Sequence, residues 1–119
     1  MINLEYGEGR CKLYLHAFRM GEDYVVDILG EGAHVGAIGV GCYDTVDSRA
    51  SSSVITMTGH RDDRIAKDGA ERISKNTKKT TVLIVGIHLD DITEEEISTI
   101  MENSKHIIDI FLEKMGELK

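Results

Sequence analysis

Residues 82–88, Val-Leu-Ile-Val-Gly-Ile-His, constrain the fold more than any other stretch of this chain. The four consecutive apolar residues at 82–85 are typical of a strand that is buried on both faces. Gly86 permits a bend in the backbone or the close approach of another group. A helix is predicted a few residues later, and open α/β sheets bind ligands where strands end and helices begin. The stretch therefore predicts a central strand that brings His88 to a candidate binding edge.

Composition and charge restrict the class of protein. The chain has 119 residues, of which 41% are apolar and 29% charged, and this predicts one globular domain over residues 1–119. A formal net charge of −7 argues against non-specific nucleic-acid binding, which depends on Lys and Arg. The sequence shows no signal-peptide pattern, and its apolar runs are much shorter than the about 20 residues that a membrane-spanning helix needs. We therefore expect a cytoplasmic protein without membrane partners. Cys11 and Cys42 match no metal or redox spacing and are expected to be buried free thiols.

Apolar periodicity predicts the order of the secondary structure. Residues 1–9 are polar and Gly-rich and are expected to be a loose lead-in, and residues 44–53 are expected to be a polar loop. Five runs predict strands, at residues 10–19, 24–29, 34–43, 54–58 and 78–87. One helix is expected between the last two strands. A second follows a capping box formed by Thr93 and Glu96, and its apolar stripe runs from Ile97 to Met115.

This order, β-β-β-β-α-β-α, predicts an α+β fold with a five-stranded, mostly antiparallel sheet and two helices. The first two strands are expected to form an antiparallel hairpin. The helix between residues 54–58 and 78–87 is expected to be a crossover, which would make these two strands parallel neighbours in a right-handed unit.

The predicted third strand is unusually poor in side-chain volume, because Gly36, Ala37, Gly39 and Gly41 lie among its apolar residues. Two interpretations fit. The strand offers a flat surface to another backbone or to a planar ligand, or it packs closely under a helix or forms a bulged, barrel-like strand. Its spacing is not GxGxxG and no helix follows it directly, so a Rossmann or P-loop site is rejected.

Three of the five histidines, His34, His60 and His88, lie close to glycines at predicted strand ends. Parallel neighbouring strands would bring His60 and His88 together, near Arg61, Asp62, Asp90 and Asp91, and an antiparallel neighbour would bring His34 to the same edge. His16 and His106 are expected to be structural or at the surface.

Three chemistries remain open for these histidines. A metal site would combine them with Asp90, although no local HxH or HExxH spacing supports it. Acid–base catalysis would use an imidazole, although no Ser or Cys lies on a recognisable nucleophile elbow. Anion binding would use the amides of Gly59-His60-Arg61 at a helix start, helped by Arg61 and Arg49. The hydroxyl-rich segment Arg49-Ala-Ser51-Ser52-Ser is also suited to a phosphate, or is an ordinary solvated loop.

Several segments together resemble one family. They are His34-Val-Gly-Ala-Ile, Ser52-Ser-Val-Ile, Gly59-His60-Arg61-Asp62 and Gly86-Ile87-His88-Leu-Asp90, with Thr93 and Glu96-Ile97 downstream. They are similar to the small LpdD-like proteins, and the resemblance covers roughly residues 10–115. It implies a fold like that of the proteasome assembly chaperones, which commonly dimerise. It also implies a non-enzymatic, homodimeric chaperone that binds prenylated FMN, or FMN, and assists a UbiD-type decarboxylase such as gallate decarboxylase.

The cofactor-binding residues expected on this basis are His34, Gly36, Arg49, Ser51, Ser52, Gly59, His60, Arg61, Asp62, Gly86, His88 and Asp90. No residue is assigned as catalytic or as a metal ligand. One alternative is a protein assembly chaperone that does not bind flavin. The other is a small His-dependent metal enzyme.

Overall fold

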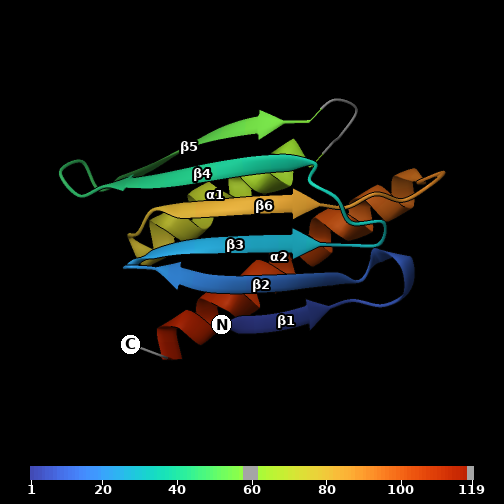
Figure 1. Ribbon diagram of the computed structural model, residues 1–119, viewed down its shortest axis with the longest axis horizontal. Helices are drawn as coiled ribbons and strands as arrows, with labels where there is room; N and C mark the ends of the chain where they lie inside the picture. Colours follow the sequence, from blue (N-terminus) through green and yellow to red (C-terminus); the bar gives the residue numbers. More distant parts are fainter. Residues whose placement is uncertain (58–61, 118–119) are drawn as a thin grey trace.

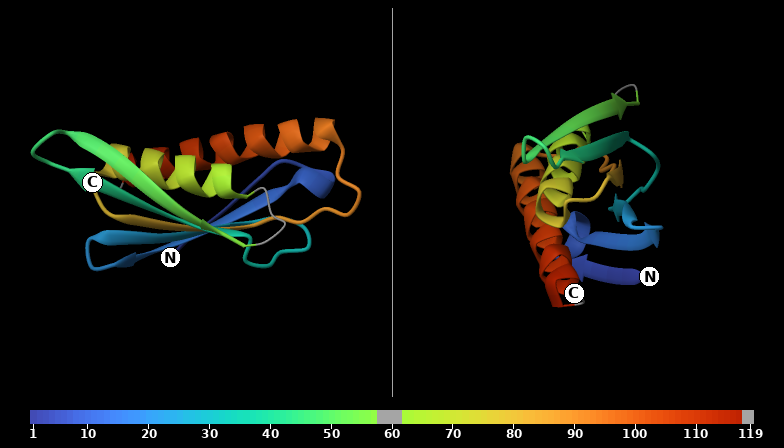
Figure 2. Two further views of the ribbon diagram at one scale, coloured as in Figure 1. Left: turned by 90° about the horizontal axis from the view of Figure 1, so that it is seen from above. Right: turned by 90° about the vertical axis from the view of Figure 1, so that its left-hand side faces the viewer.

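A computed structural model describes residues 1–57 and 62–117 as one sheet with two helices packed on one of its faces (Figures 1 and 2). The strands are β1 (Ile2–Tyr6), β2 (Leu13–Met20), β3 (Asp23–Leu29), β4 (Ala37–Asp44), β5 (Arg49–Thr56) and β6 (Thr81–Gly86). The helices are the short 3-10 helix η1 (Gly9–Cys11) and the α-helices α1 (Asp63–Thr77) and α2 (Glu94–Glu117).

The sheet is mixed, with the strand order β1-β2-β3-β6-β4-β5. The hairpin of β2 and β3 is antiparallel, as predicted, and β4 forms a second antiparallel hairpin with β5. The central strand β6 runs parallel to β3 and antiparallel to β4. The α+β class is therefore confirmed, but the expectation of five mostly antiparallel strands is wrong, since the sheet has six strands and is mixed.

Two strands begin where the sequence predicted loops. Ile2, Leu4 and Tyr6 in β1 pack against the core, and this short strand pairs antiparallel with β2. Its alternation spans only five residues, which is too short a pattern to stand out. Strand β5 begins at Arg49 within the expected polar loop. It is a hydroxyl-rich edge strand held by its backbone ladder with β4, so hydrophobic periodicity gives it a weak signal.

The prediction that β5 and β6 are neighbouring strands is wrong, because β4 lies between them. A short turn connects β4 to β5 and makes β5 the outer strand of that hairpin. Strand β4 is antiparallel to both β5 and β6, so β5 and β6 still point the same way. Their carboxyl ends reach the same edge of the sheet, separated by one strand.

The small residues of β4 allow this strand to pack directly beneath α1. A Cβ atom at Gly39 would lie 2.2 Å from the carbonyl oxygen of Ala66, and one at Gly41 would lie 2.2 Å from that of Ala70. Contacts this short exclude any side chain. Close packing under a helix is therefore the correct interpretation at these two positions, and their glycines do not form a bed for a ligand.

The hydrophobic core lies between the sheet and the two α-helices. The apolar stripe of α2 enters it as predicted, and Phe111 packs edge-on against Tyr24 with 5.8 Å between ring centroids. The largest apolar side chains that are fully buried are Phe111, Leu13, Leu15, Ile28, Ile73, Leu83 and Ile107.

Both cysteines are free thiols, as predicted, but only Cys11 is buried and Cys42 is exposed. Neither described helix is long and apolar enough to span a membrane.

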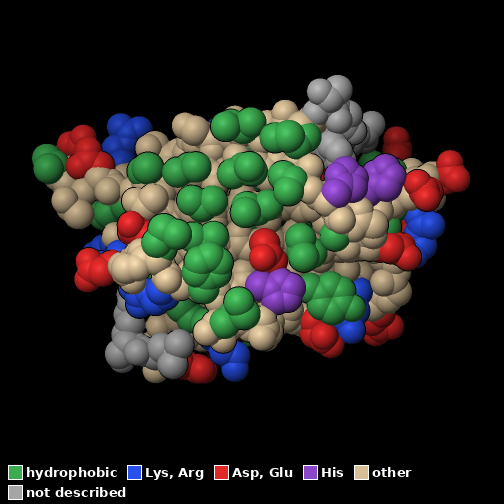
Figure 3. Space-filling view, in the orientation of Figure 1, with side chains coloured by type: hydrophobic (Ala, Val, Ile, Leu, Met, Phe, Trp, Pro, Cys, Tyr) green, Lys and Arg blue, Asp and Glu red, His purple; other side chains and the backbone are tan. Residues whose placement is uncertain are grey.

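The other face of the sheet is not covered by either α-helix, and hydrophobic side chains spread across it (Figures 2 and 3). We call it the open face. Along each strand its residues alternate with those of the core, and the strand register aligns them in rows across the sheet. The open face is lined mainly by Tyr14, His16, Phe18, Val25, Asp27, Leu29, Ile38, Val40, Cys42, Ile55, Val82 and Ile84.

Candidate functional site

Two of the predicted histidines meet beyond the carboxyl end of β6. The ring centroids of His34 and His88 are 5.5 Å apart, with 45° between the ring planes. His88 Nε2 lies 3.2 Å from Asp90 Oδ1, and all three residues are exposed. We call His34, His88 and Asp90 the histidine edge. It presents two imidazoles and a carboxylate, which can donate and accept hydrogen bonds to a polar ligand near neutral pH.

The connection between β3 and β4 builds this edge by folding against the end of β6. The Gly30 amide donates to the Gly86 carbonyl oxygen at 3.0 Å, and the His88 amide donates to the Glu31 carbonyl oxygen at 3.0 Å. The backbone that carries His34 is thus tied to the backbone that carries His88, although the two residues are far apart in the sequence.

Gly86 provides the close approach that its position in the sequence predicted. A Cβ atom there would lie 2.2 Å from the His34 carbonyl oxygen, so any side chain would displace the loop. Gly36, which was also predicted to bind the cofactor, donates its amide to the Val85 carbonyl oxygen at 2.9 Å. Both glycines are buried and position the histidine edge through the backbone.

Asp62 was predicted to bind the cofactor, but its side chain is buried and contacts the backbone of the chain itself. It is 6% exposed, and its Oδ2 accepts a hydrogen bond from the Ile87 amide at 3.2 Å. The carboxylate therefore links the start of α1 to the backbone next to His88. This contact lets Asp62 position the backbone of the candidate site.

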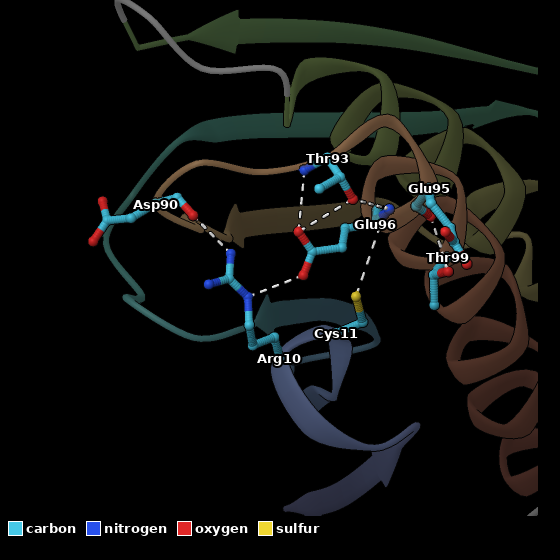
Figure 4. A network of polar contacts seen from close by, with 7 residues as sticks. All are labelled: Arg10, Cys11, Asp90, Thr93, Glu95, Glu96 and Thr99. Carbon is cyan, nitrogen blue, oxygen red and sulfur yellow. Dashed lines mark hydrogen bonds and ion pairs between the residues drawn. The ribbon is translucent and has the colours of Figure 1, made fainter.

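Arg10 contacts the segment that joins Asp90 to α2 at two points (Figure 4). Its Nη2 donates to the Asp90 carbonyl oxygen at 2.7 Å, and its Nε lies 3.0 Å from Glu96 Oε2. The capping box is confirmed, since Thr93 donates its amide to Glu96 Oε1 and accepts from the Glu96 amide, both at 3.0 Å. The pKa of Glu96 is lowered, chiefly because the Thr93 amide donates to its carboxylate, with a further contribution from the Arg10 charge.

No local pattern in the sequence indicates the role of Arg10, which lies 80 positions before Asp90. The neighbouring Cys11 thiol lies 3.8 Å from the Glu96 carbonyl oxygen. Burial, and secondly the negative charge of Glu96, raise the pKa of Cys11. This thiol is therefore a poor nucleophile and belongs to the packing of α2.

The hydroxyl-rich segment does not join the histidine edge. Arg49 and Ser51 lie at the start of β5, and only its far end, Thr56, pairs with Ala37 near that edge. At about 3.3 Å per residue, seven residues separate the two ends by about 23 Å. Ser52 faces α1, where its Oγ donates to Glu71 Oε1 at 2.8 Å and accepts from Lys67 Nζ at 3.2 Å.

The predicted residues Gly59, His60 and Arg61 lie outside the described residues, so their part in the site stays a prediction. Met57 and Asp62, which flank the segment, both contact the histidine-edge region: the Met57 amide donates to the Gly36 carbonyl oxygen at 2.8 Å. Within residues 1–57 and 62–117, no group of three or more His, Cys, Asp or Glu residues is arranged to hold a metal ion.

The histidine edge adjoins the open face. Gly86 pairs with Leu29, a residue of the open face, and the His34 backbone lies over Gly86. In Figure 3, two histidines (purple) lie side by side at the margin of the apolar surface. The sequence patterns did not predict that this surface is a functional feature. Its only signal was the unbroken apolar run at 82–85, because a strand with one covered face needs apolar residues only at every second position.

Comparison with protein families matches residues 7–116 to the prenylated flavin chaperone LpdD-like domain. The chain belongs to this family. The match covers nearly the whole chain and includes every residue of the histidine edge.

Comparison with solved structures finds the same fold in a chain from a chaperone complex for yeast 20S proteasome assembly. The TM-score is 0.63, and the match covers 98% of this chain and 94% of the yeast chain at 13% sequence identity. Comparison with curated protein sequences gives no match. The structural likeness confirms the predicted proteasome assembly chaperone-like fold.

Proposed function

We propose that this protein is a non-enzymatic carrier that binds prenylated FMN and assists the maturation of a UbiD-type decarboxylase. The observation that supports the proposal most is the pairing of His34 with His88 at the margin of an apolar surface, in a chain of the LpdD-like family. A prenylated flavin combines a large apolar ring system with polar ring edges and a ribityl phosphate. The histidine edge supplies hydrogen-bonding groups, and the adjoining residues Leu29 and Ile84 supply apolar contact.

The exposure of the site suits a carrier. His88 retains 52% of its side-chain exposure. A ligand held at such an edge is incompletely enclosed, and its release requires no opening of a core. We expect moderate affinity, transfer of the cofactor to the decarboxylase through a transient complex, and a homodimeric carrier.

The test is to produce the protein together with a flavin prenyltransferase, record its visible absorption spectrum, and titrate the purified protein with FMN by fluorescence quenching. We expect a flavin spectrum and saturable binding. A colourless protein that does not quench FMN fluorescence would contradict the proposal.

Two histidine variants locate the site, and a third histidine is the control. We expect His34→Ala and His88→Ala each to weaken flavin binding at least about fivefold, roughly 1 kcal/mol for a lost hydrogen bond. His106→Ala should bind as the wild type does, because His106 lies on α2 and stacks on Tyr6, with 5.2 Å between ring centroids. Equal losses in all three variants would contradict a site at the histidine edge.

A second candidate is a protein assembly chaperone that does not bind flavin. The exposed apolar open face favours it, because such surfaces are typical of protein contacts. Affinity purification of the chain from its own cells separates the two candidates. Flavin-independent recovery of an assembling multisubunit complex would favour the second candidate, and flavin-dependent recovery of a decarboxylase the first.

A further inference from the structure

We infer that the protein has a second ligand site, an apolar cavity beneath the carboxyl end of α2 that binds a small apolar carboxylate through Arg19. The cavity lies on the helix side of the sheet, where Tyr24 of β3 pairs with Thr81 at the start of β6. Gly86, next to the histidine edge, ends the same strand, and about five residue steps of about 3.3 Å separate its two ends by roughly 17 Å. The inference therefore concerns a different site from the proposed flavin site.

The walls of this cavity are mostly apolar and come from four elements that meet only in the folded chain. They include Ile2 of β1, Ala17 of β2, Tyr24 of β3, and Phe111 and Met115 of α2. The Tyr24 and Phe111 rings meet edge to face, with 5.8 Å between their centroids, and both residues are buried. Such rings offer a large apolar contact area to the body of a ligand.

The volume of the cavity selects a small ligand. It measures about 200 Å³, whereas sites for drug-sized molecules begin at about 300 Å³. An apolar cavity of about 150 Å³ in another protein binds benzene. The space beneath α2 therefore accommodates one aromatic ring or a short alkyl chain with one small polar group, and it is too small to enclose a flavin.

Arg19 supplies the polar contact of this cavity. Its guanidinium lies over the Tyr24 ring, with 4.7 Å between Cζ and the ring centroid, and its Nη2 donates to the Glu22 carbonyl oxygen at 2.8 Å. These two contacts hold the planar group in place. A guanidinium has five N–H donors, so several of them are left for an anion in the cavity.

No acidic side chain within residues 1–57 and 62–117 forms an ion pair with Arg19. The next two carboxylates along the chain have other partners, since Glu22 Oε2 lies 3.5 Å from Lys79 Nζ and Asp23 Oδ1 accepts from the Thr80 amide at 3.1 Å. The charge of Arg19 is thus left uncompensated in a chain with 21 acidic residues. A carboxylate matches the guanidinium in shape, and the apolar walls favour a carboxylate with an apolar body over a free phosphate.

The test titrates the purified full chain with benzoate by isothermal titration calorimetry. Benzyl alcohol is the control for the ring without the charge, and inorganic phosphate is the control for the charge without the ring. We expect saturable binding of one benzoate per chain, at least about tenfold weaker binding of benzyl alcohol, and no displacement of benzoate by phosphate. Absence of benzoate binding would overturn the inference, as would equal binding of benzyl alcohol or displacement by phosphate.

Two matched substitutions locate the carboxylate. Arg19→Gln removes the proposed partner, and Arg64→Gln makes the same change at an exposed arginine of α1. We expect Arg19→Gln to weaken benzoate binding at least about tenfold and to leave benzyl alcohol binding unchanged, while Arg64→Gln binds both probes as the wild type does. Wild-type affinity for benzoate in Arg19→Gln would overturn the assignment.

A third substitution locates the apolar body of the ligand. Ala17 is 3% exposed and lines the cavity, so Ala17→Leu should fill part of the space and weaken the binding of both probes at least about fivefold. Wild-type binding by a folded Ala17→Leu protein would overturn the location, and Arg19→Gln, at an exposed position, decides the question if Ala17→Leu does not fold. His88→Ala should bind benzoate as the wild type does, so failure of this site and failure of the flavin site are distinguishable.

Discussion

The two faces of the sheet use the same strands and differ in what covers them. On β6, Leu83 and Val85 point to the helices and are fully buried, while Val82 and Ile84 point the other way and are only half-buried. The covered face owes its burial to α1 and α2, which follow β5 and β6 in the chain. An apolar pattern therefore indicates which residues favour burial, but it does not indicate which part of the structure buries them.

The largest difference between the faces is expected from truncating neighbours on β6. Leu83→Ala removes a fully buried side chain and should lower the free energy of unfolding by about 3 kcal/mol. Ile84→Ala, one residue further along on the open face, should lower it by only about 1 kcal/mol in the isolated chain. Urea unfolding at the lowest practical protein concentration measures both. Equal losses would show that the open face is already buried at that concentration.

The next largest effect is expected where β4 touches α1. Gly39→Ala places a methyl group 2.2 Å from the Ala66 carbonyl oxygen, so strand and helix must separate, and we expect a loss of about 2 kcal/mol. Gly116→Ala is the matched control, since a Cβ there meets nothing within 4 Å. Thermal unfolding of both variants tests the packing, and a Gly39→Ala protein as stable as the wild type would contradict it.

The smallest effect is expected at the start of α2, one of the two helices that cover the core face of the sheet. The pKa of Glu96 is lowered from its ordinary value of 4.5, so its carboxylate stabilises the fold above that pH, and the stabilisation is lost as the pH falls through the lowered pKa. Glu96→Gln should therefore be less stable than the wild type at neutral pH and approach it in acid. Urea unfolding across this pH range checks the sign. A difference that grows in acid would contradict the role of the carboxylate.

Local patterns predicted those parts of the molecule whose causes lie close together in the sequence. The capping box of Thr93 and Glu96 depends on residues three positions apart, and the stripe of α2 repeats every turn. Strand β5 was recognised only at its end, because its serines carry little hydrophobic signal. The proximity of the candidate site residues was predicted in part. His34, His88 and Asp90 come together, but Arg49 and Ser51 lie at the opposite end of β5.

The sequence by itself determined that residues 82–85 form a central strand, that Gly86 admits a close contact, and that His88 follows at the end of that strand. Only the tertiary structure decided that β4 lies between β5 and β6, that His34 lies beside His88, and that Arg10 contacts Asp90. These outcomes depend on strand order and on contacts between residues distant in the sequence, which local periodicity does not encode. The open face shows the same division. The apolar pattern of that face can be recognised in the sequence, but its exposure follows from the packing of both α-helices on the other side of the sheet.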